Sequence, residues 1–141
     1  FACTFIYECA KYYFRSIRFQ ILDRALYFAL PIYAMILTLL EPTGWYTLSV
    51  VISSGITLFF WLRAPKFKFI GIAFLISLIP FLIVNGILTG GATSEPIVWY
   101  NELQKVTPRI WTIPMEDVLY CFTLIISVFL LSEFFEKRRL I

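Results

Sequence analysis

Residues 69–88 read FIGIAFLISLIPFLIVNGIL, a run of twenty residues without a single charge. About 20 consecutive apolar residues form a helix long enough to cross the hydrocarbon core of a bilayer. Three more runs of comparable length lie at residues 21–40, 45–62 and 117–135, and a shorter apolar stretch occupies residues 1–14. The sequence therefore predicts an all-α integral membrane protein with four full transmembrane helices and a partial N-terminal helix.

The overall composition also favours a membrane protein. Of the 141 residues, 60% are hydrophobic and 15% are charged, whereas soluble domains average about 45–50% apolar and about 25% charged residues. The chain opens with Phe1-Ala2-Cys3, directly in apolar sequence, with neither an initiator Met nor a charged region before it. We therefore expect a chain that lacks its natural N-terminus, and not a signal peptide.

Lysine and arginine residues predict the orientation of the helices, because cytoplasmic loops are enriched in them. Ten of the twelve cations form three groups that alternate onto one face, namely Lys11 to Arg24, Arg63 to Lys68 and Lys137 to Arg139. The opposite face receives only Lys105 and Arg109 of these cations, and Glu116 and Asp117 are expected on the same face, at the outer leaflet. We expect both termini to be cytoplasmic. Because the cations flank the spans and form no basic stripe, the net charge of +3 does not indicate a nucleic-acid partner.

Several kinds of site are excluded by residues that the sequence lacks. There is no histidine, which is the commonest metal ligand and general base. Cys3, Cys9 and Cys121 show no C-x-x-C spacing, so neither a disulfide framework nor a zinc site is indicated. Glycine-rich nucleotide motifs and the serine-hydrolase motif are also missing. Carboxylates remain as proton-transfer groups, and we predict no metal site.

Two adjacent acids, Glu116 and Asp117, stand at the head of the last apolar run. Pro114 fits the position just before a helix, and the helix dipole favours acids in the first turn. A cap, however, needs one acid. Neighbouring carboxylates at the edge of the hydrocarbon repel each other and lose hydration, which favours a proton on one of them. Such a pair can divide acid and base roles. The residues alone leave a helix cap and a catalytic pair equally open.

Polar and aromatic residues gather between the third and fourth full spans. Trp99, Tyr100 and Trp111 are typical of side chains that rest at the level of the lipid headgroups. Asn85 lies within a span, where a polar residue is a functional candidate, although an interhelical hydrogen bond is its more common role. Gly90 and Gly91 are expected to permit a sharp exit from the third full span.

Pro31 and Pro80 fall inside predicted spans. Each proline frees a backbone carbonyl and should kink its helix, and a kink can open a pocket between helices. The more common explanation is a packing feature, since neighbouring helices satisfy the freed carbonyl.

Three blocks carry a resemblance to a known family: Asn85–Thr89 (NGILT), Pro96–Asn101 (PIVWYN) and Arg109–Asp117 (RIWTIPMED), the last followed by Tyr120. The last block resembles the Pro-x-Glu-(Glu or Asp) signature of the cofactor-independent lycopene cyclases, which occur as two small membrane polypeptides or as one fused chain. Thr107-Pro108 and Trp111 depart from the family, which usually has smaller residues around Arg109.

The resemblance implies a tandem of two three-helix units. Residues 15–141 would then form a lycopene-cyclase-like transmembrane domain, the second unit with its extra helix. Residues 1–14 would be the truncated end of the preceding helical repeat, whose own acidic motif is absent from this chain. A partner half-cyclase subunit, or the preceding repeat of the same chain, is implied as the partner. The implied location is the bacterial cytoplasmic membrane.

The resemblance also implies a redox-neutral reaction without a cofactor. An acid protonates a terminal double bond of lycopene or a similar carotenoid, an internal double bond closes a six-membered ring, and a base removes a neighbouring proton. Glu116 and Asp117 are the implied catalytic acid and its counter-ion or base, in an order left open. Arg109 is expected to hold the loop by pairing with one of these carboxylates. The residues expected to support the site or bind substrate are Asn85, Glu95, Trp99, Tyr100, Asn101, Arg109, Trp111 and Tyr120.

Two alternatives stand beside lycopene cyclisation. Related membrane enzymes elongate or hydrate carotenoid ends, and no residue in the sequence identifies the end group of the substrate. A non-enzymatic membrane subunit would use the same acids as helix caps or as a proton relay.

Overall fold

The computed structural model describes residues 2–14, 20–64 and 69–139. Within these residues the α-helices are α1 (Ala2–Tyr13), α2 (Gln20–Leu40), α3 (Trp45–Arg63), α4 (Ile70–Gly86) and α5 (Asp117–Arg139). Helices α2, α3 and α5, and α4 together with the turn that continues it to Gly91, each provide a stretch long and apolar enough to cross a membrane. The chain is an all-α membrane protein with four spans, which confirms the predicted fold class, and α1 corresponds to the predicted partial helix.

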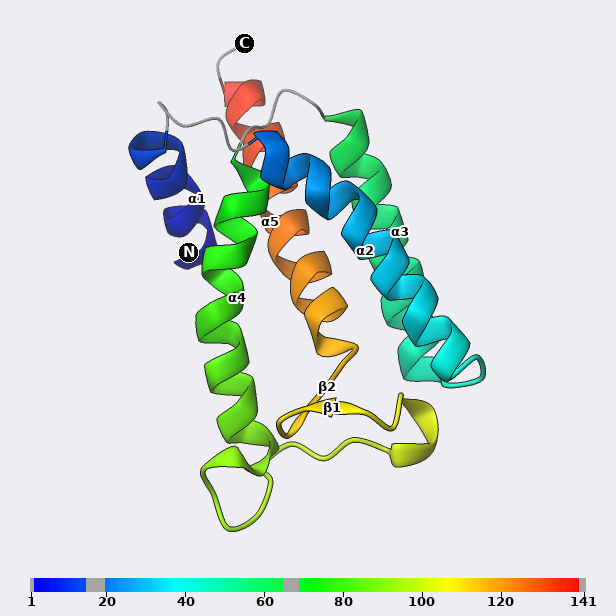
Figure 1. Cartoon of the computed structure of the whole chain (residues 1–141). Coiled ribbons are helices and arrows are strands. Elements are labelled where there is room, and N and C mark those ends of the chain that lie inside the picture. Colours follow the sequence, from blue (N-terminus) through cyan, green and yellow to red (C-terminus); the bar gives the residue numbers. More distant parts are fainter. Residues whose placement is uncertain (1, 15–19, 65–68, 140–141) are drawn as a thin grey trace.

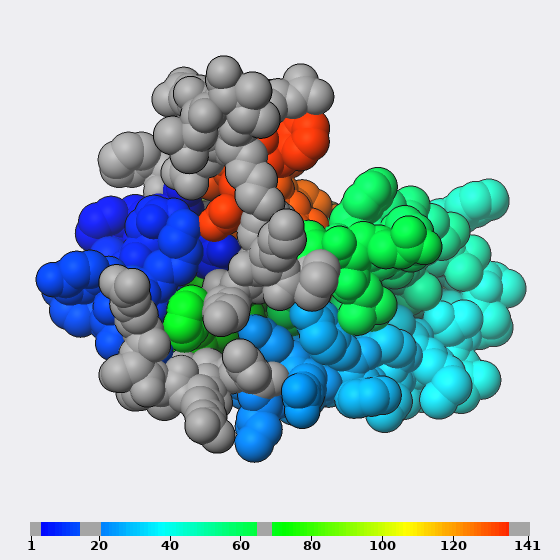
Figure 2. All heavy atoms as spheres, turned by 90° about the horizontal axis from the view of Figure 1, so that it is seen from above, coloured from blue at the N-terminus to red at the C-terminus, as the bar shows by residue number. Residues whose placement is uncertain are grey.

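The helices form a bundle around α4 and α5 (Figure 1). Helix α1 packs against both of these helices, whereas α3 packs against α5 and α2 packs against α3 and α4. Seen along the bundle, α1 and the α2–α3 pair lie on opposite sides (Figure 2). The α2–α3 turn and the segment between α4 and α5 lie at the same end, as the alternating topology predicted. The assignment of that end to the outer face stays a prediction.

Aromatic side chains fill the interior of the bundle. Trp61 of α3 is fully buried between Tyr27 of α2, at 4.5 Å between ring centroids, and Phe122 of α5, at 6.0 Å. Tyr7 of α1 stacks on Phe129 of α5 at 4.8 Å. Many large apolar side chains on the outward faces of the helices are exposed, including Phe28, Ile52 and Ile83. Exposed apolar faces of this extent fit helices whose solvent is lipid.

The first turn of α4 is capped by another helix. The first backbone N–H groups of a helix have no partner within it. In α4 the N–H of Gly71 donates to Oδ1 of Asp23 in α2, at 2.8 Å. A Cβ atom at position 71 would lie 2.4 Å from that oxygen, so glycine is needed for this close approach. The acid in the first turn of α2 therefore ties together the ends of α2 and α4.

Residues 87–116, here termed the connecting segment, hold the remaining structure. Helix α4 continues into a π-helical turn, η1 (Ile87–Gly91), which ends where Gly90 adopts a left-handed conformation with φ of 98°. A 3₁₀ turn, η2 (Glu102–Gln104), follows, and then strands β1 (Arg109–Ile110) and β2 (Ile113–Pro114) pair antiparallel. In Figure 1 this segment crosses beneath the head of α5.

The connecting segment is where the fold departs most from the sequence-based expectation. The third span was expected to run from residue 69 to residue 88 as one helix, but the α-helix ends at Gly86 and widens into η1. The sharp exit expected at Gly90 and Gly91 is confirmed at Gly90, which has a left-handed backbone. The interhelical links at residues 15–19 and 65–68, with the predicted cytoplasmic cations Arg15, Arg18, Lys66 and Lys68, lie outside the described residues, as does Phe1.

Candidate active site

Both acids of the predicted pair are buried. Helix α5 begins at Asp117, and Glu116 immediately precedes it, with its carbonyl accepting from the N–H of Tyr120 at 3.0 Å. The side chains are 0% and 1% exposed, respectively. Carboxylates are almost never buried to this degree unless they are paired. Their surroundings therefore decide what each can do.

Asp117 is surrounded by hydrogen-bond donors on both oxygens. Its Oδ1 accepts from the hydroxyl of Tyr46 at the head of α3, at 2.5 Å. Its Oδ2 accepts from the hydroxyl of Tyr100, at 2.9 Å, and from the side-chain amide of Asn85. Three donors from α3, α4 and the connecting segment thus converge on one carboxylate. A carboxylate that accepts two or three hydrogen bonds is stabilised in its charged form.

Glu116 has a one-sided environment. Its Oε1 accepts from the hydroxyl of Thr47, at 2.7 Å, and from the backbone N–H of Val106, at 2.5 Å. Its Oε2 is buried and has no hydrogen-bond partner among the described residues. Tyr46 and Thr47 are consecutive in α3, so the first turn of this helix supplies one hydroxyl to each acid.

The contacts of the pair disfavour the helix-cap interpretation. A capping carboxylate would accept a hydrogen bond from a backbone N–H in the first turn of its own helix. Over residues 20–64 and 69–135, the donors to Glu116 and Asp117 come from α3, α4 and the connecting segment, and none is an N–H of α5. The two acids therefore connect the head of α5 to other parts of the bundle, and they do not cap their own helix.

Tyrosine rings enclose the pair. The rings of Tyr46 and Tyr100 are 5.7 Å apart between centroids, and Tyr33 of α2 donates to the carbonyl of Met115 at 2.8 Å. Burial, followed by the charge of Asp117, raises the pKa of the Tyr100 phenol above its ordinary value. Tyr100 therefore keeps its proton, and stays a donor to Asp117, well into the alkaline range.

Glu102, Lys105 and Arg109 form an ion-pair cluster over Glu116. Glu102 accepts from Lys105 at 2.7 Å and from Arg109, and these two hydrogen-bonded cations hold its pKa below its usual range. Lys105 is buried although Glu102 is 61% exposed, and Lys105 directly precedes Val106, the donor to Glu116. The expected pairing of Arg109 with Glu116 or Asp117 is wrong, because Glu102 and the carbonyl of Thr112 occupy its guanidinium.

The β1–β2 hairpin is fixed against the end of α4. Thr112 donates to the carbonyl of Gly86 at 3.1 Å and shares a hydrogen bond with Thr89 at 2.8 Å. Trp111 has a backbone φ of 59°. Its ring lies against Gly86 and Gly91, where added Cβ atoms would come within 2.5 Å and 2.4 Å of the ring. The two glycines thus make room for this ring, which is otherwise exposed.

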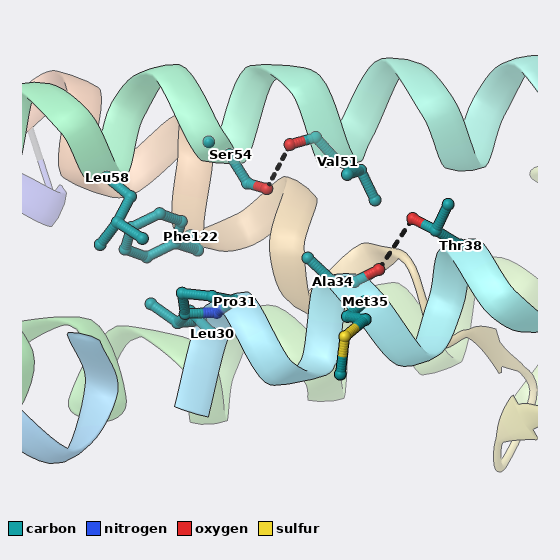
Figure 3. Close-up of a pocket in the computed structure, with 10 residues that line it drawn as sticks. Leu30, Pro31, Ala34, Met35, Thr38, Val51, Ser54, Leu58 and Phe122 are labelled. Atoms are coloured by element: carbon teal, nitrogen blue, oxygen red, sulfur yellow. Dashed lines mark hydrogen bonds between the residues drawn. The ribbon is translucent and has the colours of Figure 1, made fainter. Parts of the chain in front are cut away.

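Apolar cavities lie between the helices of the bundle. One groove of about 350 Å³ lies between α4 and α5, with Ile6 of α1 at its edge, and includes Asn85, the donor to Asp117. A second cavity, of about 380 Å³, lies between α2 and α3 over Phe122 (Figure 3). Its hydroxyl groups, on Thr38 and Ser54, turn back to carbonyls of their own helices. Pro31 lines the second cavity and Pro80 lines the first.

The structure brings four of the ten predicted site residues together: Asn85 and Tyr100 bind Asp117, and Glu116 directly precedes it. Asn101 instead caps η2, where it accepts from the N–H of Leu103. Tyr120 lies beside Phe81, 6.5 Å away between ring centroids. The side chains of Glu95 and Trp99 are exposed.

The sequence-based prediction missed several partners of the acids: Tyr46, Thr47 and the N–H of Val106. One signal pointed to the first two. Tyr46 and Thr47 open a predicted span at the end of the bundle where the acids were also expected.

Over the part of the chain that the structure describes, no group of three His, Cys, Asp or Glu side chains is placed to hold a metal ion. The site is built from carboxylates, hydroxyls and aromatic rings within apolar helices.

Comparison with known proteins matches residues 43–135, about two thirds of the chain, to the family described as lycopene cyclase. The chain belongs to the lycopene cyclase family. The matched region of this lycopene cyclase family member contains α3, α4, the connecting segment and the membrane-spanning part of α5, and therefore every residue that binds Glu116 or Asp117. No curated protein and no solved structure matches the chain.

Proposed function

We propose that the protein cyclises the ends of lycopene, or of a similar linear carotenoid, by acid catalysis within the membrane. Cyclisation moves hydrogen and closes a carbon–carbon bond with no net oxidation, so proton-transfer groups are sufficient. Glu116 and Asp117, which are buried and hydrogen-bonded to α3, are such groups. The main support for the proposal is that this buried pair lies inside the region matched to the lycopene cyclase family.

The surroundings of the pair suit a hydrocarbon substrate with a cationic intermediate. Burial in a water-poor site strengthens electrostatic stabilisation of developing charge. One carboxylate of the pair can supply a negative charge, and the rings of Tyr46 and Tyr100 supply aromatic faces of the kind that attract cations. Acid chemistry on an alkene requires little else from the protein.

The α4–α5 groove is the proposed path of the carotenoid end. It is lined almost entirely by apolar side chains, and its one amide, that of Asn85, donates to Asp117. The cavity between α2 and α3 contains no side chain that binds either acid. A larger cavity of about 530 Å³ lies further along α3 and α5 and is lined by residues such as Ile56 and Phe60 of α3 and Leu131 and Phe134 of α5. Continuity with Asp117 therefore favours the α4–α5 groove.

The test is expression in a bacterium that accumulates lycopene, followed by chromatography and mass spectrometry of the pigments. We expect a product with the mass of lycopene and the absorption of a cyclised carotenoid. Glu116→Gln and Asp117→Asn should each reduce conversion by about a hundredfold or more, the usual scale for loss of a proton-transfer group. Glu41→Gln, in the α2–α3 turn at the same end of the bundle, is the matched control and should cyclise normally.

Product mass separates the alternatives. Cyclisation leaves the mass unchanged, hydration adds one water, and elongation adds carbon. An increase in mass by one water would show that the protein hydrates the carotenoid end, and an increase by added carbon would show that it elongates the end; either result would reject cyclisation. Unmodified lycopene, from cells in which the protein is inserted in the membrane together with any partner unit, would favour a non-enzymatic subunit.

The organisation of the complete enzyme is part of the proposal. Residues 15–141 would serve as one cyclase unit, and residues 1–14 would end a preceding repeat, in agreement with the packing of α1 on α4 and α5. A partner half-cyclase or a preceding repeat would complete the enzyme. The proposed location is the bacterial cytoplasmic membrane, with the C-terminus in the cytoplasm.

A further inference from the structure

The two acids differ in how their oxygens are satisfied, and the order of their roles follows from that difference. Among the described residues, both oxygens of Asp117 accept hydrogen bonds, whereas only one oxygen of Glu116 does. The backbone N–H of Val106 can only donate, so Oε1 of Glu116 is fixed as an acceptor. The buried Oε2 is left without a donor among the described residues.

A negative charge is more costly on Glu116 than on Asp117. Burying a charged group without compensating hydrogen bonds is strongly unfavourable, and a proton removes the charge. A proton on Asp117 would compete with the donors that already surround that carboxylate, from Tyr46, Asn85 and Tyr100. A proton on Oε2 of Glu116 displaces no hydrogen bond, because that oxygen accepts none in the described structure.

We infer that the pair holds one proton, located on Oε2 of Glu116, and that Asp117 is a permanent anion. This inference rests on the proposed cyclisation and assigns the roles within it. Glu116 is the catalytic acid, and Asp117 is the counter-ion of the carbocation. The dipole at the N-terminus of α5 favours the charge at its first residue, Asp117.

The same carboxyl group closes the reaction. Glu116 gives its proton to one carbon of the terminal double bond, whose π electrons form the new C–H bond and leave a tertiary cation. The π electrons of an internal double bond then form the ring C–C bond. Finally a neighbouring C–H bond breaks, its electrons form a new double bond, and its proton returns to Glu116. Substrate and product are isomers, and the enzyme is restored in one cycle.

Infrared spectroscopy of the purified, membrane-reconstituted protein tests the inference without requiring activity. At neutral pH we expect the carbonyl band of a protonated carboxyl group. This band should be lost in Glu116→Gln and retained in Asp117→Asn and in the control Glu41→Gln. Loss of the band in Asp117→Asn with retention in Glu116→Gln, or no such band in the unchanged protein, would overturn the assignment.

Two milder variants test the assignment should either acid variant fail to fold. Thr47→Val removes a donor to the carbonyl oxygen Oε1 and should move the band to higher frequency. Tyr46→Phe removes a donor to Asp117 and should leave the band in place. The opposite pattern would place the proton on Asp117. Pigment analysis tests cyclisation separately, so a protonated Glu116 in a protein that forms no ring would reject the function and keep the location of the proton.

Discussion

At the residue scale, the two acids differ through their partners and not through their own chemistry. Glutamate and aspartate have similar carboxyl groups. Asp117 accepts three hydrogen bonds from three elements, whereas Glu116 keeps one oxygen unpaired within the described structure. In the proposed mechanism, each donor that binds Asp117 would therefore adjust how well this carboxylate stabilises the carbocation.

Tyr100→Phe tests this dependence. The change removes one donor to Oδ2 of Asp117 while it keeps the aromatic ring. A hydrogen bond to a charged group contributes about 1.5–3 kcal/mol, so we expect turnover to fall by about tenfold to a hundredfold. The measurement is the initial rate of pigment conversion in membranes that contain equal amounts of each variant. Tyr12→Phe, at an exposed tyrosine of α1, is the control; equal rates for all three proteins would argue against a role for the Tyr100 hydroxyl.

At the element scale, α4 connects the lipid-facing surface to the acids. Its groove side contains Ser77, Val84 and Asn85, and the neighbouring residue Ile83 lies outside the groove. The connecting segment continues α4 and is fastened back over Glu116 by Glu102, Lys105 and the N–H of Val106. Access to the pair thus depends on one helix and on the segment that follows it.

Val84→Trp should block the proposed substrate path. Val84 and Ile83 are 56% and 57% exposed, but only Val84 lines the groove. We expect cyclisation to fall at least tenfold in Val84→Trp and to remain near the starting rate in Ile83→Trp. Pigment conversion, normalised to the amount of protein in the membrane, measures both. Equal loss in the two variants would assign the effect to general disturbance of α4, and equal retention would direct the search to another cavity.

The Glu102 cluster makes the order of the connecting segment dependent on pH. The folded-state pKa of Glu102 is lowered, so its contribution is present above the unfolded-state pKa and is lost as the pH falls through the folded value. We expect backbone amides of residues 101–106 to stay protected from hydrogen exchange below the ordinary glutamate pKa and to lose protection at still lower pH.

Hydrogen exchange measured by mass spectrometry checks this expectation. Comparison with Glu102→Gln at each pH removes the intrinsic dependence of exchange on pH. The variant should be less protected at neutral pH and equal to the unchanged protein in strong acid. A constant ratio between the two proteins at every pH would contradict a role for the charge of Glu102.

At the scale of the whole molecule, the sequence was sufficient to predict the fold class and to single out the two acids of the candidate site. Long apolar runs have one favourable solution in lipid, so the four spans could be predicted. The position of Glu116 and Asp117 at the head of the last helix was also predictable. Their partners were not, because Tyr46 and Thr47 are about 70 residues distant in sequence and the contact depends on how α3 is rotated.

The prediction that Arg109 pairs with Glu116 or Asp117 was wrong for a related reason. Charge complementarity alone could not distinguish Glu102 from the conspicuous acids nearby, and the short β1–β2 hairpin that orients Arg109 has only two residues in each strand. Such a small element leaves no clear pattern in the sequence. Local geometry therefore selected a partner that composition could not identify.

The adjacent hydroxyls of Tyr46 and Thr47 have a consequence for assembly of the bundle. Apolar helix faces are nearly interchangeable in lipid, because the surrounding chains are as apolar as the side chains. Successive helical residues point about 100° apart, so only one rotation of α3 presents Tyr46 to Asp117 and Thr47 to Glu116 together. The two hydrogen bonds to the acids thus favour this rotation of α3 about its axis over other rotations that lipid would tolerate equally well.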